Sequence, residues 1–152
     1  MAEGQDEKPW HAAFPSPRAS LADQTLSSIT AEELRAKFDE SEDKDLSKRD
    51  WLVVDVRRTD FEDAFIRGAI NLPAHSFYPT LPSLLPILSR YKSVLFHCQS
   101  SSGRGPRCGG WYQDALNDAG ISKEQSRAVV LEGGIKRWVQ EYGEDAEVTV
   151  KL

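Results

Sequence analysis

Short apolar segments alternate with amphipathic ones along most of the chain. Mainly apolar segments of four to six residues lie at 51–56, 69–72, 93–97 and 128–131. Such short runs are typical of strands that are buried on both faces of a parallel sheet. Helix-like segments separate them, so the pattern predicts an α/β fold. We expect a central, mainly parallel sheet of about five strands, flanked by helices on both faces and joined by right-handed crossovers.

The first helix is predicted to begin at Thr30. Thr30 and Glu33 have the spacing of a capping box, in which each side chain binds the other residue's backbone N–H. The helix is expected to continue to about Phe38. The charged and polar residues 39–50 are expected to form a solvated loop.

Four further helices are predicted along the chain. Residues 60–65 are interpreted as a short helix. Leucines at helical spacing in 81–88 predict another, which two prolines should shorten or kink. An apolar stripe over 108–119 predicts an amphipathic helix that ends at Gly120. The last helix is expected to follow Gly133-Gly134 and to run through Trp138.

The N-terminal segment differs in composition from the rest. Residues 1–24 contain three prolines among polar and small residues, which predicts an extended arm and not a domain. Trp10 and Phe14 are the residues expected to pin this arm. Residues 25–152 are assigned to a single domain, which is long enough to bury a core.

Composition narrows the classes of function. The formal net charge of −5 argues against a chain-wide surface for nucleic acid or an anionic membrane. No apolar run approaches the ~20 residues of a membrane-spanning helix, and the N-terminus has no apolar signal core. We therefore expect a cytoplasmic or nuclear protein. The two cysteines and three histidines show neither a disulfide framework nor zinc-type spacing, so no metal or cofactor is expected.

The candidate chemistry lies between the apolar segment 93–97 and the amphipathic helix that follows. Cys98 and Arg104 bracket five small or polar residues, which gives a C-x(5)-R spacing. The bracketed residues are Gln99, Ser100, Ser101, Ser102 and Gly103. A loop of this composition can curl so that its backbone N–H groups point inward and bind an anion. The positive end of the following helix and the planar guanidinium of Arg104 add to the same site.

The same features favour the thiolate form of Cys98. A cysteine at a helix N-terminus or beside a fixed cation can have its pKa lowered from ~8.5 to between ~3.5 and ~7.5. A loop that binds a tetrahedral dianion would therefore also activate its nucleophile. The expected reaction is in-line attack on phosphorus or arsenic, which forms a covalent intermediate that is then broken down. A bare C-x(5)-R match is weak, but here the strand–loop–helix context accompanies it.

Residues 26–142 resemble the rhodanese superfamily, and within it the cell-division-cycle-25-like phosphatases and related arsenate reductases. The resemblance rests on Asp55-Val-Arg57, on residues 66–73, on the loop after His97, and on residues 131–138. It implies a single rhodanese-like catalytic domain with Cys98 as the nucleophile. By the same resemblance, Gln99 to Gly103 would line the anion site, Arg104 would hold the oxyanion, and Asp55 would support the loop from behind.

The chain departs from that family pattern at three places. Gln99 and Gly103 replace acidic loop residues that have been discussed as proton donors. Val56 stands where a cysteine able to form a protective disulfide is often found. Ala64-Phe65 replaces the usual Gly-His. The first departure leaves the general acid unassigned, and Asp60, Glu62 and His75 are candidates because they follow predicted strand ends.

Other titratable residues have both a structural and a functional interpretation. His97 could tune the thiolate, although its alternation with Cys98 along the strand favours a buried structural histidine. Cys108 could resolve an intermediate, although its place on an apolar helical stripe favours inert packing. Four arginines could attract an acidic phosphopeptide, or could be ordinary solvated charges: Arg57, Arg58, Arg67 and Arg107.

Four hypotheses for the function remain open. The first is a cysteine-dependent phosphatase of the protein tyrosine or dual-specificity type. The second is an arsenate reductase that uses the same cysteine, with glutathione as co-substrate and glutaredoxin as a possible partner. The third is a thiosulfate sulfurtransferase, against which the longer loop counts, since sulfurtransferases of this fold generally have a loop one residue shorter. The fourth is a non-catalytic phosphate-binding module, against which the retention of Cys98 and Arg104 counts.

Overall fold

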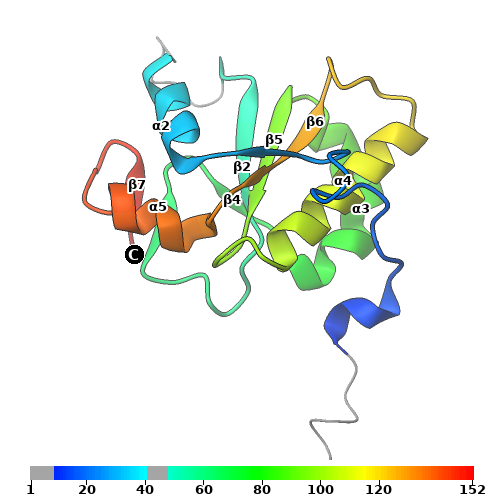
Figure 1. The fold of residues 1–152 in the computed structure, drawn as a ribbon, viewed down its shortest axis with the longest axis horizontal. Helices are drawn as coiled ribbons and strands as arrows, with labels where there is room; N and C mark the ends of the chain where they lie inside the picture. Colours follow the sequence, from blue (N-terminus) through cyan, green and yellow to red (C-terminus); the bar gives the residue numbers. More distant parts are fainter. Residues whose placement is uncertain (1–8, 41–47) are drawn as a thin grey trace, which may run out of the picture.

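The computed structural model describes residues 9–40 and 48–152, and a five-stranded parallel sheet forms the centre of that part of the chain (Figure 1). The strand order is β1-β6-β5-β2-β4. Every neighbouring pair of strands is parallel, as the apolar segments predicted. The strands are β1 (Ser27–Ile29), β2 (Trp51–Asp55), β4 (Ile70–Asn71), β5 (Ser93–His97) and β6 (Arg127–Leu131). The α/β class is confirmed.

Helices cover both faces of this sheet. Alternate residues of β2 and β5, such as Val54 and Phe96, pack beneath α3 (Ala74–Leu88) and α4 (Arg104–Asp118). Residues between them, such as Leu95, pack beneath α2 (Ala31–Glu40) and α5 (Gly134–Tyr142). The central strands are therefore buried on both faces, which explains why their sequences are continuous apolar runs.

The start of α2 is the capping box predicted from the sequence. The Thr30 backbone N–H donates to Oε1 of Glu33 at 2.9 Å, and the Glu33 N–H donates to Oγ1 of Thr30 at 3.1 Å. The helix extends to Glu40, two residues beyond the expected end. The loop predicted at 39–50 lies largely outside the described residues, because residues 41–47 are not among them.

The prediction of a short helix at 60–65 is wrong. The chain there forms a turn and then β3 (Ala64–Ile66), which pairs antiparallel with β7 (Thr149–Lys151) in a separate two-stranded sheet. The guanidinium of Arg57 donates to the backbone carbonyl oxygens of Asp60, Glu62 and Ala64. Those carbonyls are then directed to one buried cation, so they are not available for a helical hydrogen-bond pattern.

Helix α3 is longer than its prolines suggested. It is one element of 15 residues with Pro79, Pro82 and Pro86 inside it. Its apolar face, which includes Phe77 and Leu81, is buried in the core shared with α4. Tertiary packing therefore outweighs the local cost of the missing N–H donors.

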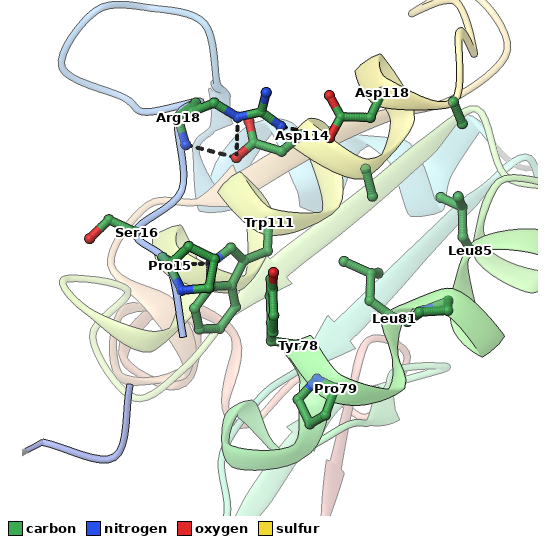
Figure 2. Close-up of a pocket in the computed structure, with 13 residues that line it drawn as sticks. Pro15, Ser16, Arg18, Tyr78, Pro79, Leu81, Leu85, Trp111, Asp114 and Asp118 are labelled. Atoms are coloured by element: carbon green, nitrogen blue, oxygen red, sulfur yellow. Dashed lines mark hydrogen bonds and ion pairs between the residues drawn. The ribbon is translucent and has the colours of Figure 1, made fainter. Parts of the chain in front are cut away.

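The N-terminal arm lies against α3 and α4. Its described part starts at Pro9 and includes the 3-10 helix η1 (Trp10–Ala13), where extended chain was expected. Trp10 and Phe14 pack against the core from outside. Further along the arm, the backbone from Pro17 to Ala19 crosses α4 so closely that a Cβ at Gly110 would lie 2.7 Å from it. Arm and helices enclose a hollow of about 850 Å³ lined by Tyr78, Leu81 and Trp111, among others (Figure 2). Within the described residues, no helix is both long and apolar enough to cross a membrane.

Candidate active site

The loop from Cys98 to Arg104 lies at the carboxyl end of β5, in the middle of the sheet. Ligands of open parallel sheets bind at this end of the strands. The Sγ atom of Cys98 accepts two backbone N–H groups, from Ser101 at 3.2 Å and from Gly105 at 3.3 Å. The N–H of Gly105 belongs to the first turn of α4, so the helix N-terminus points at the sulfur. Both backbone N–H groups are therefore directed at the same sulfur atom.

The conformation of the loop is fixed by the start of α5. The N–H of Ile135 donates to the Cys98 carbonyl at 3.1 Å, and the N–H of Lys136 donates to the Gln99 carbonyl at 3.0 Å. A Cβ at Gly134 would lie 2.6 Å from both carbonyl oxygens, and this residue has φ +61°. The two carbonyls therefore point away from the Cys98 side of the loop, which leaves N–H groups to face it. The paired glycines predicted to precede a helix thus have a second role beside the loop.

The bracketed residues differ in their exposure. Gln99, Ser100, Ser102 and Gly103 are exposed, whereas Ser101 is buried with φ +58°. Ser100 Oγ and Ser102 Oγ lie 2.8 Å apart, as a hydrogen-bonded pair. The Oγ atom of Ser101 is buried and has no partner among the described residues. Of these five residues, Ser101 is the one whose backbone N–H bonds to Cys98 Sγ.

Arg104 forms an ion pair that the spacing did not reveal. Its two terminal nitrogens donate to the two carboxylate oxygens of Asp60, at 2.9 Å and 2.6 Å. The guanidinium of Arg104 holds the pKa of the Asp60 carboxyl well below its usual range. Asp60 is therefore ionised near neutral pH and does not offer a proton in this state. The hydrogen bonds to Asp60 in turn raise the pKa of Arg104.

A buried charge cluster stands behind the loop. Asp55 is fully buried and accepts hydrogen bonds from the backbone N–H and the guanidinium of Arg57. Arg57 is 2% exposed, so the interpretation of this arginine as a solvated charge is wrong. Through its bonds to the carbonyls of 60–64, Arg57 positions the turn that carries Asp60.

His97 belongs to the same support. Its Nδ1 lies 3.1 Å from the Cys98 carbonyl oxygen, and its Nε2 lies 3.6 Å from Oδ2 of Asp55. Burial lowers the pKa of His97, although the charge of Asp55 opposes this. His97 is fully buried, which agrees with its interpretation as a structural histidine.

The other candidates occupy different positions around the site. Glu62 borders a hollow of about 430 Å³ together with Gln99 and Lys136. His75, near the start of α3, has its pKa lowered by burial and by the charges of Arg58 and Arg104. Cys108 is fully buried, and burial raises the pKa of its thiol. Cys108 therefore does not present a reactive thiolate to the loop.

The comparisons with known proteins agree with this architecture. Residues 30–141 match the rhodanese-like domain family. Arsenate reductase 2.2 of Oryza sativa subsp. japonica is 36% identical over 87 residues, which are 57% of this chain and 67% of that protein. CDC25-like phosphatase YCH1 of Saccharomyces cerevisiae is 40% identical over 108 residues, covering 64% of this chain and 71% of that protein.

A solved structure adds the spatial comparison. The crystal structure of Saccharomyces cerevisiae Ygr203w, described as a homolog of single-domain rhodanese and the Cdc25 phosphatase catalytic domain, superposes with a TM-score of 0.70. The two chains are 27% identical, and the match covers 82% of this chain and 87% of that one. This chain therefore belongs to the rhodanese-like domain family, and it is an enzyme whose relatives are named as arsenate reductases and phosphatases.

Proposed function

We propose that this chain is a cysteine-dependent phosphatase of the protein tyrosine or dual-specificity type. The observation that carries the proposal is the pair of backbone N–H groups that converge on Cys98 Sγ, in a five-residue loop that ends at Arg104. Such a loop binds a tetrahedral dianion and activates a thiolate with the same donors. The phosphatase named among its relatives supports this reading.

The proposed reaction has two steps. The Cys98 thiolate attacks phosphorus in line, the bond from phosphorus to the leaving oxygen breaks, and a cysteinyl-phosphate forms. Water then hydrolyses that intermediate, releasing inorganic phosphate and the thiolate. In both steps the loop N–H groups and Arg104 stabilise the charge on the three equatorial oxygens.

Proton donation to the leaving group is weak in this proposal. Asp60 is ionised in its pair with Arg104, and Gln99 and Gly103 carry no acid. Aryl phosphates have leaving groups that need less protonation than alkyl phosphates do. We therefore infer a preference for aryl phosphomonoesters.

Arsenate reduction is the second candidate, because a relative that is 36% identical is named as an arsenate reductase. Arsenate has the shape and charge of phosphate, so the same loop would bind it. Its reduction takes two electrons, and Cys108 is too deeply buried to act as the resolving thiol. The electrons would then come from an external thiol such as glutathione, with or without a glutaredoxin.

One experiment tests both candidates. Hydrolysis of para-nitrophenyl phosphate is measured for the wild type, Cys98→Ser and Arg104→Ala, with arsenate and glutathione assayed in parallel. We expect turnover to vanish in Cys98→Ser and to fall strongly in Arg104→Ala. The faster of the two substrates selects between phosphatase and reductase. A folded, reduced wild type that turns over neither substrate would contradict both candidates. Unaltered turnover by Arg104→Ala would contradict the proposed binding of the oxyanion by Arg104.

A further inference from the structure

The start of α3 places the imidazole ring of His75 next to the Arg104–Asp60 pair. This pair lies beside the loop from Cys98 to Arg104, which we call the oxyanion loop. Helix α3 follows β4, whose Asn71 is in register with Asp55, and Asp55 is in turn in register with His97. The first turn of α3 therefore lies at the same edge of the sheet as Cys98. The imidazole of His75 is close enough to Arg58, Arg104 and Asp60 for their charges to act on it.

The N-terminal arm covers this ring with a tryptophan. The ring centroids of Trp10 and His75 lie 4.6 Å apart with their planes 34° from parallel. Trp10 also meets Trp111 edge-on, with centroids 6.1 Å apart. Trp10 is only half-buried, so part of its surface stays open to a ligand. His75 Nδ1 is buried and has no hydrogen-bond partner among the described residues.

The arm that carries Trp10 is anchored at several points (Figure 2). The indole N–H of Trp111 donates to the Pro15 carbonyl at 2.8 Å. The backbone N–H of Arg18 donates to Asp114 at 2.7 Å, and its guanidinium donates to Asp118 at 2.7 Å. Phe14 packs on Tyr78 and Trp111. The arm that carries Trp10 is therefore held by contacts with α3 and α4 that do not involve His75.

We propose that Trp10 and His75 form an aryl-binding wall beside the oxyanion loop, which selects phosphomonoesters of flat aromatic groups over aliphatic ones. The inference rests on the proposed phosphatase function and deepens it by assigning a subsite for the leaving group. The part of the Trp10 indole that stays exposed beside His75 presents a flat apolar surface, and a substrate ring gains by packing against it in an offset or edge-on arrangement. The low pKa of His75 keeps the wall uncharged at neutral pH, so a neutral substrate ring can approach without displacing bound charge.

The alternative is that Trp10 only fastens the arm. A purely structural role would weaken every ligand alike, whereas a wall contacts only the aromatic part of a ligand. The comparison of phenyl phosphate with inorganic phosphate therefore separates the two roles.

Calorimetric binding to the full-length chain is measured on a Cys98→Ser background, so no turnover is needed. Variants are Trp10→Ala and the conservative Trp10→Phe, with folding checked by thermal melting. We expect Trp10→Ala to weaken the binding of phenyl phosphate about tenfold and the binding of inorganic phosphate less than twofold. Trp10→Phe should restore most of the loss. With Cys98 intact, Trp10→Ala should show the same loss in steady-state kcat/KM for an aryl ester and no loss for an alkyl ester.

The other outcomes are distinguishable. Equal weakening of both ligands, or no weakening of phenyl phosphate, would overturn the wall and leave the phosphatase proposal standing. If Cys98→Ser with Trp10 intact binds neither ligand, the oxyanion loop itself is contradicted, and the wall falls with it.

Discussion

Arg104 donates both terminal nitrogens of its guanidinium to the carboxylate of Asp60, so the arginine proposed to bind an oxyanion is already held by an anion of the chain itself. Asp60 is fixed in turn, since its Oδ1 accepts the backbone N–H of Arg58 and its carbonyl accepts from Arg57. A fixed carboxylate orients the guanidinium before a substrate arrives. The same carboxylate lowers the positive potential that a dianion meets, so Asp60 acts on orientation and on affinity in opposite directions.

Replacing Asp60 by Asn should strengthen binding of inorganic phosphate. The amide keeps the shape of the carboxyl group but removes the charge that competes for Arg104. Both side chains are partly exposed, so the pair contributes about 1 kcal/mol, and the inhibition constant of phosphate should fall about fivefold. Competitive inhibition of para-nitrophenyl phosphate hydrolysis measures this, with Glu62→Gln as the control for loss of a nearby carboxylate. Weaker phosphate binding in Asp60→Asn would mean that orientation of Arg104 outweighs competition.

Gly134 is expected to be essential to the loop. In Gly134→Ala the new Cβ would meet two loop carbonyls at 2.6 Å, at a residue with φ +61°. Displacing those carbonyls moves the N–H groups that face Cys98, so kcat/KM should fall about 100-fold or more. Gly120→Ala is the matched control, because Gly120 has φ +71° but no atom within 4 Å of the added Cβ. It should lose about 1 kcal/mol of stability and keep its kcat/KM within twofold. Equal kcat/KM losses in the two variants would point to backbone strain alone.

Four of the five strands of the central sheet, and the loop, could be predicted because each is visible as a local pattern in the sequence, whereas β1 (Ser27–Ile29) was not predicted. Residues 93–97 read as a buried strand, and the small residues after Cys98 could only join it to the amphipathic helix that begins at Arg104. The functional roles of those loop residues stay predictions. The capping box at Thr30 is equally local and was also found.

What was missed depends on contacts between distant residues. Asp60 and Arg104 are 44 positions apart, and no spacing rule pairs them. The sequence pattern predicts a helix over residues 60–65 because nothing local shows that the Arg57 guanidinium is buried and binds the carbonyls of this segment. The strand β7 is three residues long and gains its place only by pairing with β3. The role of Gly134 could have been suspected from the Gly-Gly pair at a strand end, but its contact with the loop could not.

Cys108 should be dispensable for turnover. It is fully buried, and burial raises the pKa of its thiol, so it does not supply a thiolate to an intermediate on Cys98. Cys108→Ala should keep kcat/KM within twofold for phosphate esters and for arsenate with glutathione, while losing about 1–2 kcal/mol of stability through a small cavity. Cys108→Ser should be less stable than Cys108→Ala, because it buries a hydroxyl group. Denaturant unfolding and both assays measure this. A folded Cys108→Ala variant that loses arsenate reduction alone would restore the resolving-thiol role.

Stability should fall as the pH is lowered from about 7 to 5, and His97 should carry part of that loss. Burial lowers the pKa of His97 in the folded chain, whereas an unfolded histidine titrates near ~6.5. Below that pH the unfolded state binds a proton that the folded state excludes, so protonation favours unfolding. The free energy of unfolding should then fall by up to about 1.4 kcal/mol per pH unit for this one group.

The comparison that isolates His97 is the slope of stability against pH, measured by denaturant unfolding at several pH values in constant salt. His97→Gln should be less stable at every pH, because Gln cannot reproduce the imidazole's fit between Cys98 and Asp55. The free energy of unfolding of this variant should nevertheless depend less steeply on pH between pH 7 and pH 5, by the uptake of about one proton. The remaining slope should include the contribution of His75, whose pKa is also lowered. Parallel curves for wild type and variant would show that His97 takes up its proton in the folded chain. The Asp55 carboxylate, 3.6 Å from Nε2, would then compensate the charge that burial disfavours.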